Sequence, residues 1–550
     1  MKLNIRKVQY LFHIFLYPAT NLNLTRMKNK KSNPSNILSF DSEITPGQNR
    51  INRRKFISGL ATSALAVTIV PRHVLGGTGY TAPSDKITLA YIGTGTQGLR
   101  ELLPLLNIPE LQIITVCDPQ KNATGYLDWS KNGLRDDIRA TLKMPDWKSG
   151  GDNTIPGGRE NAKNIVDTYY SKFRNQQVSG SCRAYADFRE MFEKEKDLNA
   201  VKVMTPDHLH GLIAMTAIKQ GIHISMHKPI SNRLSEGFEV IEMAKKAQVT
   251  THLIPWDSNG SMDQVMIWIN SGEIGTLKEV HNWSNRPVWP QYPTLPENKP
   301  AIPEGMDWDL WLGPEAERSY SPEYTNMVFR GWYDFGGGSM ADMGHYSLWT
   351  VFKALELENP YLVEPNLSHV CGLRDSTAFQ IRNDFSFPMA SSVRFKYPAK
   401  GSRPAVDLIW YDGGMRPPVP DELYADDKEL PAEGMMFVGD KGKILAGFNV
   451  DDPKLIPAKR MDGQKIQEVP KKDRSLGFKY FMDAIKEGKQ CPGSFRDAWP
   501  ITEAVNLYAA SLRAGRMLKY DAVAKKITNV PEANKYLVRE YRKGWNPESI

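Results

Sequence analysis

The sequence predicts an α/β protein in which a doubly wound parallel sheet is followed by an α+β domain with an open, mostly antiparallel sheet. Three observations lead to this prediction. Near residue 87 a continuous apolar strand runs directly into a glycine-rich turn and then a helix. Apolar strands and helices then alternate as far as residue 254, as they do around parallel sheets. Beyond residue 276 the alternation stops, and the later strands follow one another across short turns, which favours antiparallel pairing.

The first 84 residues are predicted to be a leader and a linker. They carry 12 Lys and Arg against 2 Asp and Glu, whereas residues 85–550 carry 58 against 60. The net charge of +8 therefore belongs to the leader, and the rest of the chain lacks the basic excess typical of nucleic-acid binding. Arg53 and Arg54 precede a weakly apolar run at 57–70, which resembles a twin-arginine signal and is too short to span a membrane. We therefore expect an exported, periplasmic protein with no stable membrane anchor.

The first strand leads into a dinucleotide-binding motif of the Rossmann type. It ends in Gly93-Thr94-Gly95-Thr96-Gln97-Gly98, and the residues that follow are helical. Glycines at these spacings let the backbone turn tightly and approach a pyrophosphate, which then lies at the helix N-terminus. The second strand ends in Asp118, twenty residues after Gly98. A carboxylate there accepts hydrogen bonds from the adenosine ribose and repels a 2′-phosphate, so the sequence predicts NAD rather than NADP.

The cofactor-binding domain is expected to span residues 85–258. An insertion at about 125–158, without clear periodicity, separates its second and third strands. The second domain is expected at 259–550, with two late amphipathic helices that pack back on the first domain.

Two loops follow strands of the first domain at the edge where doubly wound sheets bind ligands. One begins with Thr205-Pro206 and includes His208 and His210; the other is His227-Lys228-Pro229. The two histidines of the first loop have no carboxylate or cysteine cluster to complete a ligand set, so we expect no metal.

The second domain contains a candidate site for alcohol chemistry. A glycine run at 336–338 precedes a predicted helix in which spacings of three and four place Asp342, His345 and Tyr346 on one face. An acid, an imidazole and a phenol together are what alcohol oxidation needs, because the hydroxyl proton must leave as hydride departs.

Tryptophans are concentrated in the same domain, with five of thirteen between residues 283 and 332. The apolar faces of pyranose rings stack on indoles, while sugar hydroxyls need hydrogen-bond partners. We therefore expect Arg286, Trp289 and Trp332 to bind a sugar, although tryptophans of an irregular segment also serve as core anchors.

These motifs together resemble the Gfo/Idh/MocA (glucose–fructose oxidoreductase/inositol dehydrogenase) family, and the resemblance extends from residue 86 to the C-terminus. It implies that Lys228 contacts both cofactor and substrate, and that Thr205, Pro206 and His210 lie near the nicotinamide. It also implies homo-oligomer contacts through the sheet of the second domain. Family members usually have Glu before this lysine, where the chain has His227. They place the base four residues after the Asp, and in this chain that position is Tyr346. The histidine, His345, lies one residue before that position. Either could be the base; we favour His345, whose usual pKa is nearest neutrality.

The resulting hypothesis is an NAD-dependent oxidoreductase that acts on a sugar or glycoside hydroxyl. Lys228 would polarise the hydroxyl, Asp342 would orient a second hydroxyl or the base, and hydride would pass to the nicotinamide. Because an exported enzyme cannot draw on cytoplasmic NAD, we expect the cofactor to stay bound and to be restored within each cycle. Two alternatives remain: a glycoside hydrolase that works by transient oxidation, and a non-catalytic exported sugar-binding protein.

Overall fold

The computed structural model describes residues 85–122, 126–148, 155–174, 182–254, 261–466 and 475–550. All of them fall in one compact unit, Val70–Ile550. The predicted leader with its twin-arginine motif, parts of the insertion and the predicted domain boundary near residue 258 lie outside the described residues.

The first domain is built on a six-stranded sheet in which every neighbouring pair is parallel. Its order is β3-β2-β1-β4-β5-β6, so successive strands are added outward on one side of β1 and then, from β4, on the other. Open α/β sheets bind their ligands at this switch point between β1 and β4. The strands are β1 (Ile87–Ile92), β2 (Leu111–Cys117), β3 (Arg183–Tyr185), β4 (Ala200–Val203), β5 (His223–His227) and β6 (Thr251–Ile254).

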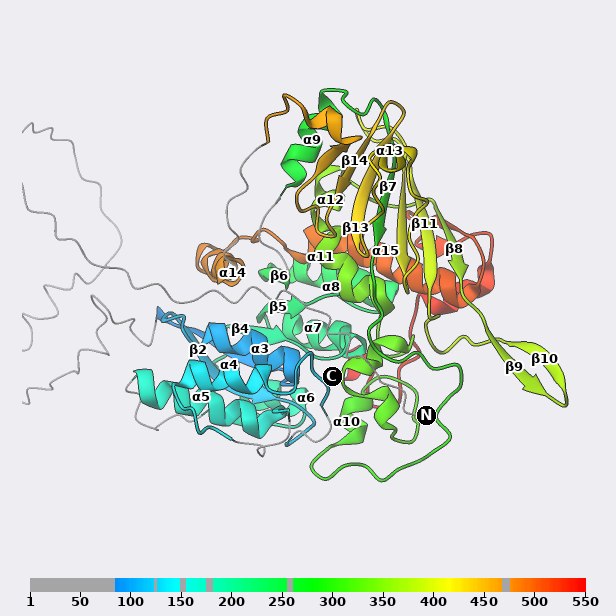
Figure 1. Ribbon diagram of the computed structural model, residues 1–550. Helices are drawn as coiled ribbons and strands as arrows, with labels where there is room; N and C mark the ends of the chain where they lie inside the picture. The colour runs from blue at the N-terminus through cyan, green and yellow to red at the C-terminus, as the bar shows by residue number, and fades with distance from the viewer. Residues whose placement is uncertain (1–84, 123–125, 149–154, 175–181, 255–260, 467–474) are drawn as a thin grey trace, which may run out of the picture. The chain divides into compact units, whose positions relative to one another are not determined.

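Helices cover both faces of this sheet (Figure 1). On one face lie α3 (Thr96–Leu105), α4 (Gly133–Leu142) and α5 (Arg159–Arg174); on the other lie α6 (Phe188–Lys194), α7 (His210–Lys219) and α8 (Leu234–Ala247). The insertion thus contains a helix that the sequence analysis did not predict. In α4, Leu134, Ile138 and Leu142 recur every four residues and are buried, but the charged residues between them obscured this period.

The second domain is built on a nine-stranded sheet of order β15-β14-β13-β7-β12-β11-β8-β16-β17. Only β7 and β12 pair in parallel, so the predicted fold class is confirmed. The strands are β7 (Leu277–Trp283), β8 (Leu362–Leu367), β11 (Ser391–Tyr397), β12 (Val406–Asp412), β13 (Gly434–Gly439), β14 (Lys443–Ala446), β15 (Lys454–Ile456), β16 (Leu518–Asp521) and β17 (Lys526–Ile527). A separate hairpin, β9 (Val370–Arg374) and β10 (Thr377–Ile381), projects from this sheet (Figure 1).

Two late helices join the domains. The chain of α14 (Ser475–Glu487) buries Phe478 and Phe481 in the same apolar cluster as β1 and α3 of the first domain. The longer α15 (Phe495–Ala514) begins with a capping box and packs its middle residues against the second sheet (Figure 1). Among the described residues, no helix has the length and apolar character that a membrane crossing requires.

A buried carboxylate ties the second sheet to α15 and to the segment that carries Asp342. Asp412 of β12 accepts hydrogen bonds from the Ser391 amide at 2.8 Å, the Trp410 indole at 3.0 Å and the Tyr508 hydroxyl of α15 at 2.7 Å. It also accepts one from the hydroxyl of Ser339, just before the helical turn that bears the candidate acid. One side chain therefore sets the start of that turn.

Asp412→Ala should lower the free energy of unfolding by about 3–5 kcal/mol, because it leaves several buried donors without an acceptor. The exposed Asp146→Ala should change it by less than about 0.5 kcal/mol. Urea unfolding of both variants measures the difference. Equal stability of the two would contradict this role for Asp412.

Candidate active site

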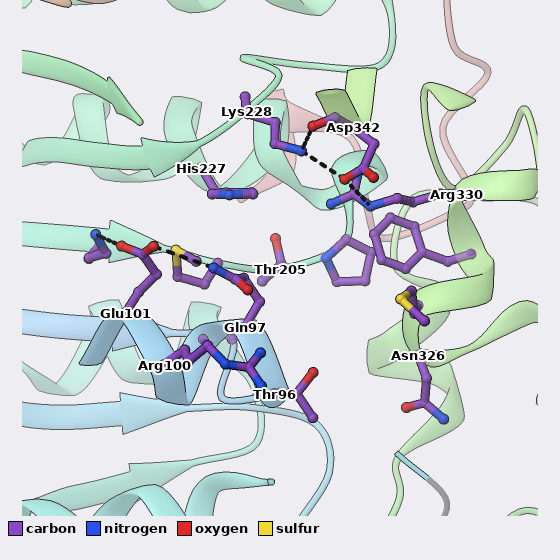
Figure 2. Close-up of a pocket in the computed structure, with 18 of the residues that line it drawn as sticks. Thr96, Gln97, Arg100, Glu101, Thr205, His227, Lys228, Asn326, Arg330 and Asp342 are labelled. Carbon is purple, nitrogen blue, oxygen red and sulfur yellow. Dashed lines mark hydrogen bonds and ion pairs between the residues drawn. The ribbon is translucent and has the colours of Figure 1, made fainter. Parts of the chain in front are cut away.

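A cavity of about 780 Å³ opens at the carboxyl edge of the first sheet and is lined by both domains. This volume is within the range of sites that hold cofactors and small ligands. Its walls include the glycine-rich loop and α3, the loops after β4 and β5, and segments of the second domain (Figure 2). The residues that line the cavity include Gly93, Gly95, Thr96, Gln97, Gly98, Asp118, Thr205, Pro206, His227, Lys228, Arg286, Arg330, Asp342 and Tyr346.

The glycine-rich loop has the form that a dinucleotide needs. Gly93 has φ +92°, and a Cβ atom on it would lie 2.5 Å from the backbone of Met204. A Cβ atom on Gly98 would lie 2.2 Å from the Gly93 carbonyl oxygen. Neither position accepts a side chain, so the turn brings the start of α3 to the cavity wall, where a pyrophosphate is favoured.

Asp118 also fits the adenosine end of NAD. One carboxylate oxygen accepts from the Thr94 amide at 2.7 Å and its hydroxyl at 3.1 Å, and the other accepts from the Gln120 amide at 2.9 Å. A carboxylate offers about four acceptor positions, so one remains for a ribose hydroxyl. Burial raises the pKa of Asp118, although these hydrogen bonds act in the opposite direction.

The chemical centre of the cavity is an ion pair between the two domains. Lys228 follows β5 and is 1% exposed. Its Nζ atom donates to the carbonyl oxygen of Asp342 and to the Asp342 carboxylate at 3.0 Å (Figure 2). The same Nζ atom lies 5.0 Å from the centre of the Tyr346 ring. The predicted lysine, acid and phenol are therefore together.

Burial and charge tune this pair in opposite directions. Burial lowers the pKa of Lys228 to about 8, although the Asp342 charge acts to raise it. Burial would raise the pKa of Asp342, but the charges of Lys228 and Arg330 outweigh it and lower that pKa to about 2. At neutral pH the pair is an ammonium and a carboxylate, and the ammonium is lost as the pH rises through about 8.

Sequence analysis missed two charged residues that extend this pair. The Nε atom of Arg330 lies 3.3 Å from Asp342, and its Nη1 atom lies 3.4 Å from the buried Asp207. Asp207 also accepts from the Gly337 amide at 3.1 Å. Asp207 lies between Pro206 and His208 in the loop after β4, where a buried carboxylate could have been suspected from the sequence. Arg330 lies in the short helical turn η4 (Asn326–Gly331), and no local pattern marks it.

The three residues predicted on one helical face do not all reach the cavity. Asp342 lies in a π-helical turn, η5 (Met340–Gly344), and His345 begins α11 (His345–Ser347). A π turn has more residues per turn than an α turn. His345, three positions after Asp342, therefore points to a different side of the helix axis, whereas Tyr346, four positions after it, stays on the same side as Asp342. His345 is buried away from the cavity, with Nε2 3.4 Å from the Thr502 hydroxyl. This placement corrects the preference for His345 over Tyr346.

Tyr346 has a partner at the position where the family usually has Glu. Its hydroxyl lies 3.1 Å from Nε2 of His227. Burial, and then the charges of Lys228 and Arg330, hold the pKa of His227 well below its usual value. The imidazole facing Tyr346 is therefore neutral.

Of the predicted sugar-binding residues, the structure brings Arg286 to the cavity but not Trp289 or Trp332. Trp332 is 1% exposed, stacks on Tyr292 and donates its indole N–H to the Glu323 carbonyl at 2.7 Å. Both indoles are buried in an irregular segment, whose need for apolar anchors outweighs the sugar-stacking interpretation. Trp129, Trp311 and Trp349 line the cavity instead.

Some residues of the loop after β4 line the cavity, and others hold the loop in place. Thr205 and Pro206 line the cavity, whereas His210 lies behind them. The ring nitrogens of His210 lie 2.6 Å from the Pro229 carbonyl and 2.9 Å from the Thr205 carbonyl, so the imidazole links the loops after β4 and β5. Within the part of the chain that the structure describes, no group of three His, Cys, Asp or Glu side chains is placed to hold a metal ion.

Family models match both domains. One, described as an oxidoreductase family NAD-binding Rossmann fold, matches residues 138–254. Another, described as the C-terminal α/β domain of the same oxidoreductase family, matches residues 274–366 and 423–547. Together they cover more than half of the chain. It belongs to the Gfo/Idh/MocA oxidoreductase family. The predicted NAD cofactor is confirmed at the level of this family; the glycine-rich loop that would hold it precedes the matched residues and is supplied by the structure.

Individual proteins similar to this family member are distant. An uncharacterized oxidoreductase, YfiI, of Bacillus subtilis (strain 168) is 27% identical over 103 residues, which is 18% of this chain and only 26% of that protein. The aldose-aldose oxidoreductase of Caulobacter crescentus, solved with glycerol, is 14% identical with a TM-score of 0.45, covering 79% of this chain and 99% of its own. The WlbA dehydrogenase of Bordetella pertussis, solved with NADH and UDP-GlcNAcA, is 12% identical with a TM-score of 0.47, covering 79% and 99%.

Asp342→Asn should lower the pKa of Lys228 below its value of about 8, because the nearest counter-charge is removed while burial stays. NMR of isotope-labelled lysine measures this pKa, with the resonance assigned by its absence in Lys228→Arg. The exposed Asp146→Asn should leave the pKa unchanged. An unchanged value in Asp342→Asn would show that the ion pair does not set the charge of this lysine.

Proposed function

We propose that this protein uses bound NAD to oxidise a hydroxyl group of a sugar or glycoside. The observation that carries the proposal is that Lys228, Asp342 and Tyr346 line the same cavity as the glycine-rich loop. A reacting carbon held beside the lysine is thus close to the place where that loop directs a nicotinamide.

The residues have separate tasks in this reaction. NAD, when bound, supplies the hydride acceptor. Lys228 donates a hydrogen bond to the reacting hydroxyl oxygen and stabilises the negative charge that grows as its proton leaves. Tyr346 accepts that proton through its phenolic oxygen. Asp342 holds the lysine charged and oriented through the contact at 3.0 Å.

The other walls of the cavity support a sugar as the substrate class. The Nε atom of Arg286 is buried and has no hydrogen-bond partner among the described residues, so it can donate to a hydroxyl group. Trp311 and Phe329 line the same cavity and make part of its wall apolar, as binding of the apolar side of a pyranose requires.

A segment of the insertion supports retention of the cofactor. This segment, which we call the strap (residues 126–129), lies over the start of α3. A Cβ atom on Gly95 would meet the Tyr126 ring at 3.1 Å, and the Arg100 guanidinium lies 2.6 Å from both carboxylate oxygens of Asp128. The strap ends at Trp129, whose ring centre lies 4.8 Å from the guanidinium of Arg286 in the second domain. It therefore lines the cavity while contacting both domains.

A retained cofactor favours a redox-neutral reaction. We propose that the chain is exported with NAD already bound, as the twin-arginine-like leader suggests, and that each cycle reduces and reoxidises the same molecule. Glycoside cleavage by transient oxidation, epimerisation and hydride transfer between two sugars all meet this condition. The ion-paired Lys228 weighs against a purely sugar-binding protein, because burying a lysine beside NAD serves no purpose in binding alone.

Trp129→Ala should release bound NADH about two- to fivefold faster, because it removes the cation–π contact that fastens the strap to the second domain. Tyr424→Ala is the matched control, since Tyr424 lies on α13 (Asp421–Ala425), is 65% exposed and does not line the cavity. The loss of NADH fluorescence after dilution into excess NAD measures the release. Equal rates in the two variants would remove the strap from cofactor retention.

Lys228→Ala should slow sugar oxidation by at least about 100-fold without loss of bound NAD, because it removes the donor that stabilises the reacting oxygen. In the unmodified protein the rate should fall as the pH rises through about 8, where the ammonium is lost. Single-turnover absorbance measures the rate, and Lys299→Ala, in an exposed loop, is the control. Normal turnover in Lys228→Ala would exclude this mechanism.

A further inference from the structure

His227 is a buried residue of the site to which the proposed mechanism assigns no task. It is the last residue of β5, is 5% exposed, and lines the cavity next to Lys228. Figure 2 shows its ring between the lysine and the residues of α3. A buried imidazole at this place either fills space or acts on a neighbour.

The contact with Tyr346 is a hydrogen bond rather than a ring stack. The distance from Nε2 to the phenolic oxygen is 3.1 Å, whereas the ring centres are 6.5 Å apart and the planes are inclined by 57°. The partners come from different domains, so the bond fixes a second-domain side chain against the carboxyl end of β5.

The surroundings of His227 keep its imidazole neutral, so that one ring nitrogen can accept a hydrogen bond. Besides burial, the charged groups of Lys228, Arg330 and Lys202 and the imidazole of His210 act on it, and all lower its pKa. A neutral imidazole has one nitrogen with a free lone pair. When that nitrogen is Nε2, the phenolic hydrogen is directed to it, and the lone pairs of the phenolic oxygen are directed elsewhere.

We propose that His227 is a positioning residue that holds the hydroxyl hydrogen of Tyr346 on its Nε2 atom, so that the phenolic oxygen accepts the proton of the reacting hydroxyl. The inference rests on the proposed function. A phenol by itself can either donate or accept a hydrogen bond, so it does not fix the direction of proton transfer. A hydrogen bond to His227 fixes that direction, because it leaves the oxygen of Tyr346 to accept the proton that oxidation removes.

The proton step balances with NAD as the oxidant. The substrate O–H bond breaks and its proton forms a bond to the Tyr346 oxygen, while the original phenolic hydrogen moves to Nε2 of His227. The electron pair of the substrate C–H bond leaves with its hydrogen as hydride to NAD, and the alcohol becomes a carbonyl. The imidazolium formed is next to Lys228 and Arg330, so it returns its proton readily, and the proton stays available for a later reduction step.

The test is a double-mutant cycle in the full chain with its bound NAD. His227→Leu should lower kcat by about 100-fold with little change in KM, as should Tyr346→Phe. The double variant should be no slower than Tyr346→Phe, because the two residues act as one unit. His227→Glu, which keeps an acceptor that can take a proton, should restore kcat to within about tenfold and shift the acid limb of the pH profile.

His223→Gln is the matched control, because His223 lies at the other end of β5 and accepts from the Thr250 amide outside the cavity. It should leave kcat and the pH profile unchanged. Normal kcat in His227→Leu, or additive losses in the double variant, would overturn the inference while the proposed function stands.

A readout independent of turnover separates the two proposals. In ¹⁵N-histidine NMR, the His227 signal should show an unprotonated Nε2 that loses its hydrogen-bond shift in Tyr346→Phe. A protonated Nε2 would overturn the inference. Failure of the unmodified protein to oxidise any sugar would instead overturn the proposed function, and the NMR result would still decide the hydrogen bond.

Discussion

The site depends on one interaction, the ion pair that Lys228 of the first domain forms with Asp342 of the second. A lysine that is 1% exposed loses most of its hydration, and only a fixed counter-charge keeps it an ammonium near neutral pH. The pair therefore requires the two domains to meet at the carboxyl end of β5. Arg330 and Asp207 continue the alternation of charge, so that neither carboxylate is buried without a cation.

The rest of the fold stabilises the contact between the two domains at the carboxyl end of β5. Asp412 anchors the start of the turn that bears Asp342, α15 packs beneath it, and α14 buries its phenylalanines in the first domain. The π turn then presents Asp342 and Tyr346 together. The strap contacts both domains as well, through Arg100 of α3 and Arg286 of the second domain.

The residues that could be predicted from sequence are those whose role is local. The glycine-rich loop and Asp118 each follow a strand at a spacing that dinucleotide binding demands. Lys228 also follows a strand, and the family resemblance implied its role; all of these residues line the cavity. The failures have tertiary causes. His345 does not reach the cavity because a π turn replaces the α-helix that the spacing predicted. Trp332 does not bind in the cavity because it is buried in the core, and the sequence alone does not distinguish a core tryptophan from one that stacks on a sugar. No sequence pattern marks Arg330 as a site residue, since only the folded chain brings its segment to Asp342.

The central claim is that this cavity oxidises a sugar with NAD that the protein already holds. The most direct measurement mixes the purified protein, with no added nucleotide, with a panel of sugars and glycosides and follows the near-ultraviolet absorbance of NADH. The account predicts a rise of no more than one NADH per chain, which decays as hydride returns to the bound intermediate or passes to a second sugar. Absence of any NADH signal from protein shown to contain NAD, or steady reduction that requires added NAD, would contradict it.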